Sequence, residues 1–208
     1  YDTDETAYAD ASSVSDDTIV EQFEITYDDA GSVLQTTTRQ RFHNATGTGE
    51  LTTPSGSHPK ARVTYAAMYH DEIGRQVAVA NYGTYGGAAF SRASVVPSRT
   101  DTILVTSTEY NDAGQAYKTI DPAGREDRQV FDDAGRVVKA IQNYVDGNPA
   151  TGGADEDVTV EMAYNADGQL STLTAKNPTT GDQTTTYVYG TTLTDSEIAT
   201  STLKRAEI

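Results

Sequence analysis

Hydrophobic and polar residues alternate along several segments of the chain. In residues 19–27, five side chains lie on one side of an extended strand: Ile19, Glu21, Phe23, Ile25 and Tyr27. In residues 158–164, four side chains lie together on one side: Val158, Val160, Met162 and Tyr164. Side chains two apart share a sheet face, and no long segment shows the helical spacing of apolar residues. The pattern predicts an all-β, mostly antiparallel protein of about twelve strands, each with one packed and one wet side.

A five-residue signature ends many of these alternating segments: an aromatic residue, Asp or Asn, two variable residues and Gly. Four close copies contain Tyr27, Asp28 and Gly31; Tyr110, Asn111 and Gly114; Phe131, Asp132 and Gly135; and Tyr164, Asn165 and Gly168. Two looser copies contain Asp71 and Gly74 after His70, and Asp121 and Gly124 after Ile120. A new alternating segment begins after each Gly, so each copy is predicted to connect two strands.

The order of residues in the signature favours one kind of turn. Asp or Asn at the first turn position accepts a hydrogen bond from a backbone N–H two residues on. Two residues then form a type I turn, where Pro122 fits, and Gly takes the left-handed position of a G1 bulge. Each copy is therefore predicted to be a hairpin tip with the aromatic residue packed at its base.

The copies are regularly spaced along the chain. Tyr110 and Phe131 are 21 positions apart (131 − 110), with the Asp121 turn between them, and Tyr27, His70 and Tyr110 are separated by about two such periods. Such regularity indicates stacked hairpin units that bury surface against their neighbours.

The signature resembles the YD repeats of the bacterial Rhs family, which includes the shell-forming subunits of Tc toxins; teneurins contain similar repeats. The resemblance spans about residues 19–190, with His70 and Ile120 in place of the aromatic residue and Ser32, Gln115 and Gln169 in place of Arg after Gly. It implies hairpins wound into a curved or spiralling sheet around a hollow. About twelve strands at ~4.8 Å give a ribbon roughly 58 Å wide, which is a segment of such a wall and not a closed shell.

Rhs-like proteins are similar to one another in a self-cleaving aspartyl segment built on paired Asp-Pro-x-Gly motifs. This chain has one such motif, at Asp121, and it lies in register with the repeat. Asp121 is therefore interpreted as a turn residue, and no catalytic residue, cofactor site or metal site is assigned.

Composition narrows the classes of function. The 208 residues contain 31 acidic and 15 basic side chains, a net charge of −16, which argues against a nucleic-acid partner. The absence of Cys excludes disulfides and thiol chemistry, and no apolar run is long enough for membrane insertion. The resemblance to the Rhs family implies a secreted or cell-surface location. We expect the chain to be part of a larger protein, because its opening residues are typical of the interior of a longer chain.

The chain divides into three parts. Residues 1–18 form an acidic leading segment, residues 19–190 the repeat sheet, and residues 191–208 run on into a further repeat. Loop insertions rich in Gly, Pro, Ser and Thr are predicted at 44–59, 83–101 and 146–157. The acidic loop 146–157 leaves Ca²⁺ binding open, although a solvated loop is the simpler interpretation.

Two functions remain open. The first is a non-catalytic wall segment, with the neighbouring repeats and an encapsulated C-terminal effector as its partners, or a rigid surface. The second is an adhesin-like module that binds surface glycans. Its stacking candidates are Tyr82 and Tyr85 beside a Gly-rich loop, because the other tyrosines belong largely to the repeat.

Overall fold

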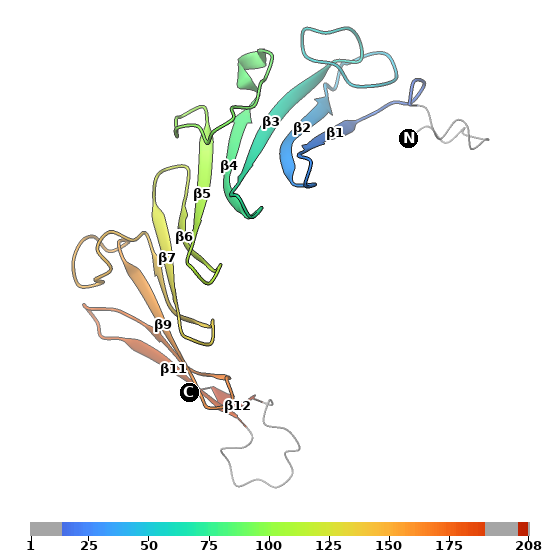
Figure 1. The fold of residues 1–208 in the computed structure, drawn as a ribbon. Coiled ribbons are helices and arrows are strands. Elements are labelled where there is room, and N and C mark those ends of the chain that lie inside the picture. The colour runs from blue at the N-terminus through green and yellow to red at the C-terminus, as the bar shows by residue number, and fades with distance from the viewer. Residues whose placement is uncertain (1–13, 190–203, 208) are drawn as a thin grey trace. The chain divides into compact units, whose positions relative to one another are not determined.

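The computed structural model describes residues 14–189 and 204–207, and their regular secondary structure is almost entirely β-strand (Figure 1). The strands are β1 (Glu21–Tyr27), β2 (Val33–Arg41), β3 (Ala61–His70), β4 (Gln76–Gly83), β5 (Leu104–Tyr110), β6 (Ala116–Ile120), β7 (Glu126–Phe131), β8 (Val137–Gln142), β9 (Val158–Tyr164), β10 (Leu170–Ala175), β11 (Gln183–Tyr189) and β12 (Lys204–Glu207). A 3-10 turn, η2 (Tyr85–Gly87), is the helical element among the described residues. The all-β prediction and the strand number are confirmed. None of the described residues belongs to a helix that could cross a membrane.

The strands lie in the sheet in the order of the sequence, from β1 at one end to β12 at the other. Paired neighbouring strands run antiparallel, such as β1 with β2 and β10 with β11. The sheet is open, because the order does not return from β12 to β1. This order follows from the short hairpin connections, which leave each strand beside the next one.

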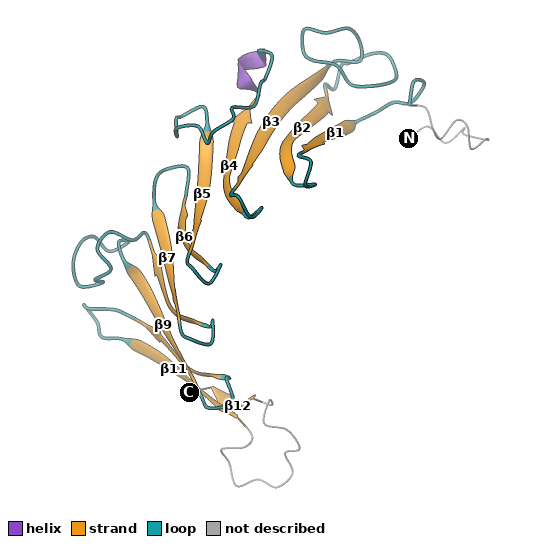
Figure 2. Ribbon diagram, in the orientation of Figure 1, coloured by secondary structure: helices purple, strands orange, loops and turns teal. Residues whose placement is uncertain are grey.

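Two kinds of connection alternate along the chain, so within each unit they lie at opposite ends of the strands (Figure 2). One end has the tight turns 28–31, 71–74, 111–114, 132–135 and 165–168. The opposite end has the longer connections 42–60, 84–103, 143–157 and 176–182, together with the tight turn 121–124. The predicted insertions 44–59 and 146–157 lie within these longer connections, and 83–101 starts one residue earlier, at Gly83, the last residue of β4.

The register from one hairpin to the next is constant. In each hairpin, the residue eight positions after the aromatic residue pairs with a residue of the next hairpin. That partner lies three positions before the aromatic residue of the next hairpin whose turn is at the same end of the strands. The pairs are Gln35 with Ala67, Ala78 with Ser107, Lys118 with Arg128, Lys139 with Glu161, and Thr172 with Thr186. Here His70 and Tyr189 take the aromatic position in their hairpins. A constant register is the structural form of the sequence repeat.

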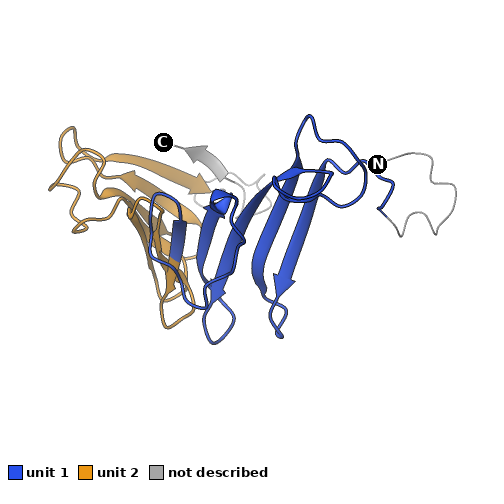
Figure 3. Cartoon of the chain, turned by 90° about the horizontal axis from the view of Figure 1, so that it is seen from above, with its two compact units in different colours: residues 1–107 blue, residues 108–208 orange. Residues whose placement is uncertain are grey.

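The chain forms two compact units, residues 1–107 and residues 108–208 (Figure 3). In the first unit, β3, β4 and β5 share a small core of buried side chains: Ala67, Tyr69, Ala78, Ala80, Tyr82 and Val105. The connection 84–103 packs on this cluster through Phe90, whose ring stacks on Tyr65 with centroids 4.6 Å apart. Arg92 of the same connection donates to the carbonyls of Leu34 and Met68.

The expectation of one packed side per strand is wrong for β1. The predicted packed side is open, since Phe23, Ile25 and Tyr27 are 64%, 46% and 56% exposed. In the second unit, β9 departs in another way: Val158 is 40% exposed, whereas Thr159 on the other face is buried. The reason is that among the described residues no second sheet packs over these strands, so both faces remain partly in contact with water.

Candidate functional site

All six predicted turns have the same backbone geometry. The N–H of the Asp or Asn donates to the carbonyl four residues on, as from Asp28 to Ser32 at 2.9 Å. The N–H of the Gly donates back to the Asp or Asn carbonyl, as from Gly31 to Asp28 at 3.1 Å. The positive φ of these glycines lies between 80° and 87°, at Gly31, Gly74, Gly114, Gly124, Gly135 and Gly168. The predicted type I turn with a G1 bulge is therefore present in every copy.

The side chain at the first turn position closes each turn a second time. Its Oδ1 accepts the backbone N–H four residues on, at 2.8 Å from Ser32 to Asp28 and at 2.9 Å from Arg136 to Asp132. The other four turns repeat this bond, from Arg75 to Asp71, Gln115 to Asn111, Arg125 to Asp121 and Gln169 to Asn165. The side chain thus satisfies a donor that the turn leaves without a ladder partner.

In five of the six turns, the residue after Gly depends on whether the turn opens with Asp or with Asn. Arg125 Nε donates to Asp121 Oδ2 at 2.7 Å, and the pairs Arg75 with Asp71 and Arg136 with Asp132 are the same. Where the first residue is Asn, its Nδ2 donates to a glutamine Oε1: Asn111 to Gln115 at 2.8 Å and Asn165 to Gln169 at 2.9 Å. The glutamines that look like departures from the repeat are therefore matched partners, neutral amide with neutral amide.

The Asp turns stabilise the ionised carboxyl. The backbone N–H of Ser32 lowers the pKa of Asp28, and that of Arg125 lowers the pKa of Asp121. For Asp132 the largest cause of its lowered pKa is the Arg136 side chain. In Asp71 desolvation raises the pKa, but the bonds from Arg75 outweigh it and the net direction is down.

In the second unit, tight turns at the same end of the strands contact their neighbours. Gln115 Nε2 donates to the Gly135 carbonyl at 3.1 Å, so the 111–114 turn is tied to the 132–135 turn. The Arg136 guanidinium lies over the Tyr164 ring, 4.4 Å from its centroid. The Tyr164 hydroxyl in turn donates to the Val137 carbonyl at 2.8 Å. The aromatic residue thus packs against the preceding hairpin.

Tyr189 makes the same contact one hairpin later. Its hydroxyl donates to the Leu170 carbonyl at 2.9 Å, and Leu170 follows Tyr164 by the same six positions by which Val137 follows Phe131. Tyr27, in contrast, is 56% exposed, because the structure describes no hairpin before β1. Tyr164 therefore packs on the preceding hairpin, whereas the predicted packing of the aromatic residue is wrong at Tyr27.

A second bulge near the base of the hairpins escapes sequence analysis. Tyr27 pairs with Val33, but Thr26 pairs with Gln35, so one residue of β2 is extra. The same shift occurs at β3–β4, β7–β8, β9–β10 and β11–β12. No residue type marks the extra position, since it is Leu34 in one hairpin and Ser171 in another, and for that reason the sequence contains no signal for it.

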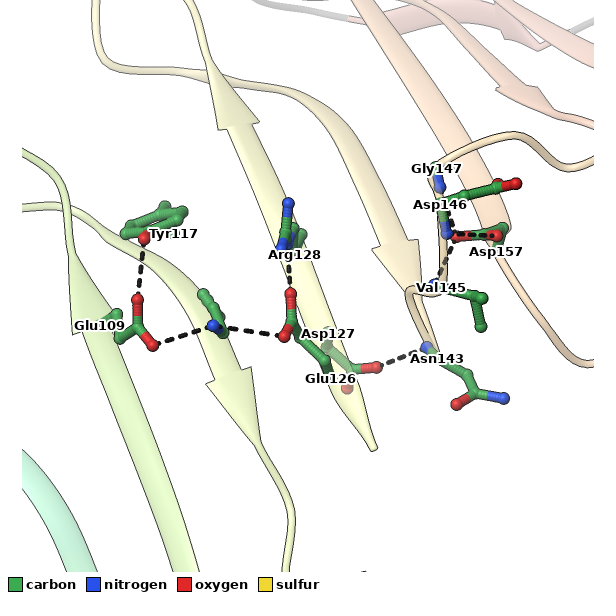
Figure 4. Close-up of polar contacts among 11 residues, drawn as sticks. Glu109, Tyr117, Glu126, Asp127, Arg128, Asn143, Val145, Asp146, Gly147 and Asp157 are labelled. Carbon is green, nitrogen blue, oxygen red and sulfur yellow. Dashed lines mark hydrogen bonds and ion pairs between the residues drawn. The ribbon is translucent and has the colours of Figure 1, made fainter. Parts of the chain in front are cut away.

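A ladder of charged side chains crosses β5, β6 and β7 (Figure 4). Lys118 Nζ lies 2.9 Å from Glu109 and 3.3 Å from Glu126, and Glu126 also pairs with Arg128. The ion pair with Lys118 and a hydrogen bond from Tyr117 lower the pKa of Glu109. In this unit, polar pairs between strands occupy positions that apolar pairs would occupy in a packed sheet.

The acidic loop uses its carboxylates internally. Asp157, 1% exposed, accepts the N–H groups of Val145, Asp146 and Gly147 (Figure 4). Its burial alone would raise its pKa, but these three bonds outweigh it and lower the pKa. Glu156 likewise accepts the Gly153 N–H. Within residues 14–189 and 204–207 no three His, Asp or Glu side chains gather as metal ligands would.

The two glycan-stacking candidates have different environments. Tyr82 is 6% exposed, its hydroxyl lies 3.3 Å from that of Tyr69, and Phe90 contacts its ring, so it has no free face for a sugar. Tyr85 is 41% exposed and has a positive φ of 50°. It borders a groove of about 520 Å³ that is also lined by Asp101, Thr102, Ile103 and Leu104.

Comparisons with known proteins give structural similarity alone. No protein-family model matches the sequence, and no curated protein matches it. The fold is similar to part of the Tc holotoxin pore of Photorhabdus luminescens, with 10% identity and a TM-score of 0.38 over 82% of this chain. It is also similar to parts of the crystal structures of TcdB2-TccC3-TEV and TcdB2-TccC3-Cdc42, with 13% and 14% identity, each with a TM-score of 0.32 over 80% of this chain. The matched region is 8% of the first of those chains and 11% of the other two.

Proposed function

We propose that this chain is a non-catalytic wall segment of a larger secreted hairpin-repeat protein, whose sheet encloses a C-terminal effector or presents a rigid surface. One observation carries the proposal: the side chains of the recurrent signature are used to close the turns and, in the second unit, to tie neighbouring hairpins together. Asp132 and Arg136 bind each other, and Gln115 and Tyr164 reach the turn or strand of the neighbouring hairpin. Side chains used in this way stabilise a continuous surface.

The repeat architecture offers a test on the chain itself. Deletion of residues 111–131 removes β6 and β7, one whole period, and joins Tyr110 to the Asp132 turn. Stacked units interact with their nearest neighbours, so we expect this shortened chain to keep a cooperative unfolding transition by circular dichroism. The matched control deletes fewer residues, 111–125, and fuses β5 to β7 without a turn; it should lose cooperativity.

The wall role requires a second test in the longer protein. Deletion of residues 19–190 should expose the effector to protease and reduce its secretion. Intact protection and secretion would contradict the wall role. Turnover in a broad hydrolase screen would contradict the non-catalytic part of the proposal.

The groove beside Tyr85 supports a second candidate, glycan binding. The ring is held edge-on by Phe90, with centroids 5.3 Å apart, yet it keeps exposed area beside Asp101 and Thr102. Aromatic rings with neighbouring polar groups are suited to sugars. Binding on a glycan array that is lost in Tyr85→Ala and kept in Tyr82→Phe would favour this candidate over the wall.

A further inference from the structure

The first two hairpins depart from the repeat at two positions that face each other. Ser32 follows Gly31, whereas an arginine follows the glycine in the other three turns that open with Asp. His70 takes the aromatic position of the next hairpin, where the other hairpins with turns at this end of the strands have Tyr or Phe.

The register between β2 and β3 brings the two departures together. Gln35 pairs with Ala67, and counting three residues further along both strands places Ser32 opposite His70. Side chains that are directly opposite on antiparallel strands lie on the same face and contact each other.

A matching position in the second unit shows what this place in the repeat normally contains. Lys139 pairs with Glu161, and the same count places Arg136 opposite Tyr164. There the Arg136 guanidinium lies over the Tyr164 ring, 4.4 Å from its centroid. Between the first two hairpins the imidazole of His70 therefore stands in place of the ring, and a serine stands in place of the guanidinium.

The Asp28 turn has no positive charge of its own. Asp28 Oδ1 accepts the backbone N–H groups of Ala30 at 2.9 Å and Ser32 at 2.8 Å. The backbone N–H of Ser32 is the largest cause that lowers the pKa of Asp28, and the charge of His70 acts in the same direction. The imidazole therefore lies close enough for its charge to act on this carboxylate.

His70 has a ring nitrogen that suits such a contact. Among the residues that the structure describes, none forms a hydrogen bond with His70 Nδ1, although this atom is buried. A buried polar atom without a partner is uncommon in folded proteins and is destabilising. A protonated Nδ1 carries an N–H that needs an acceptor, and a carboxylate accepts such a bond strongly.

The other charged groups near His70 have partners of their own or lie at exposed positions. Asp71 and Arg75 of the following turn bind each other at 2.7 Å. Arg92 of the connection 84–103 lies over the Tyr69 ring, on the face of β3 opposite to that of His70. The acidic residues at the tips of the two turns are exposed: Asp29 and Glu72. The carboxylate that opens the preceding turn is therefore the acidic partner that this arrangement offers.

We propose that protonated His70 is the cation of the Asp28 turn, and that its Nδ1–H binds the Asp28 carboxylate across the boundary between the first two hairpins. The pair acts between hairpins as the Asp–Arg pairs act within the other turns. A histidine, whose ordinary pKa is about 6.5, gains its charge between about pH 8 and about pH 5.5. Mild acidification therefore strengthens this boundary, whereas an arginine at the same place keeps its charge throughout.

A double-mutant cycle measures the link. Asp28→Asn and His70→Phe are made singly and together in the full chain, and thermal unfolding is followed by circular dichroism at about pH 5.5 and about pH 8. Phenylalanine keeps an aromatic ring, as Phe131 does in its own hairpin, but cannot be charged. At the lower pH, Asp28→Asn should lower the melting temperature by about 2 °C more in the unmodified chain than in His70→Phe. At the higher pH this difference should fall below about 1 °C.

The matched control replaces Asp28→Asn with Asp132→Asn. The cation of Asp132 is Arg136 of its own turn, which does not lose its charge in this range of pH. The effect of Asp132→Asn should therefore be the same with and without His70→Phe at both values of pH.

A second variant makes the test independent of the folding of His70→Phe. Ser32→Arg combined with His70→Tyr recreates the contact that Arg136 makes with Tyr164. In this background the loss caused by Asp28→Asn should no longer change between about pH 5.5 and about pH 8.

Three results would overturn the proposal. Coupling between Asp28 and His70 that is equal at the two values of pH, or larger at the higher one, would exclude a link that depends on protonation. Absence of coupling at both would exclude the pair itself. A loss caused by Asp28→Asn that still depends on pH in the Ser32→Arg, His70→Tyr background would assign that dependence to other groups. Each of these results leaves the proposed function standing, because a wall segment needs no charge at this boundary.

Discussion

At the scale of the residue, the Asp or Asn that opens a turn and the residue after its Gly act as a pair in five of the six turns. Asp is matched with Arg in three turns and Asn with Gln in two, and each pair is joined by a side-chain hydrogen bond. A charged pair and an amide pair are both complementary, whereas Asp with Gln or Asn with Arg loses the charge match.

This pairing predicts a recovery in a double variant. Asp132→Asn and Arg136→Gln should each lower the melting temperature, and the double variant should melt above both, because it recreates the pair of Asn111 with Gln115. Recovery should be incomplete, since Arg136 also stacks on Tyr164. Thermal unfolding followed by circular dichroism measures this; additive losses in the double variant would refute the pairing.

The glycine of the turn makes a separate prediction. Gly124 has a φ of +87° and no atom within 4 Å of an added Cβ, so Gly124→Ala tests backbone conformation alone. We expect a loss of about 1–2 kcal/mol in the free energy of unfolding, measured with urea. Gly153→Ala is the control, because Gly153 lacks a positive φ and has only ordinary contacts, and it should be nearly neutral. Equal effects of the two changes would mean that the turn does not require glycine.

At the scale of the element, the long connections differ from the tight turns in that one of them builds a core. The connection 84–103 brings Phe90 onto Tyr65 and Tyr82, and it brings the Arg92 guanidinium over Tyr69 at 4.4 Å from the ring centroid. The buried cluster shared by β3, β4 and β5 lies under this connection, although the composition of the connection is that of a surface loop.

Removal of the Phe90 ring should therefore weaken the first unit. Phe90→Ala is expected to cost about 2 kcal/mol, less than the ~3–5 kcal/mol typical of a buried phenylalanine, because Phe90 is only partly buried. Phe23→Ala removes the same ring from an exposed site and should change the free energy of unfolding by less than about 0.5 kcal/mol. Urea denaturation of both variants decides; a larger loss for Phe23→Ala would contradict this assignment of the core.

At the scale of the whole molecule, stability should depend on pH through the turn carboxyls. The pKa values of Asp28, Asp71, Asp121 and Asp132 are lowered in the folded chain. Their stabilisation is present above about pH 4, the ordinary range of an unfolded aspartate, and is lost as pH falls through the lower folded values. The net charge of −16 at pH 7 has the opposite effect, since moderate acidification relieves repulsion.

The urea midpoint should therefore be highest near about pH 5 and fall steeply below about pH 4. The variant that combines Asp132→Asn with Arg136→Gln has one ionisable turn fewer, so its midpoint should fall less. A midpoint that stays constant from about pH 5 to about pH 2.5 would exclude the turn carboxyls as a source of stability.

Local signals account for what the sequence predicts well, and contacts distant in sequence account for what it misses. The turns are predicted because Asp28 and Gly31 need no partner outside the turn. The core under Phe90 and the burial of Tyr82 depend on a connection that folds back over the sheet. The repeat in the sequence does not indicate this folding. Alternation in 19–27 predicts the strand but not its exposure, because exposure depends on which strand lies beside β1.

Each signature closes a hairpin, and backbone NMR of the isotope-labelled chain measures this without any substitution. We expect positive φ at the six signature glycines and cross-strand contacts from Tyr27 to Val33, Phe131 to Val137 and Tyr164 to Leu170. Negative φ at these glycines, or the absence of those contacts, would contradict it.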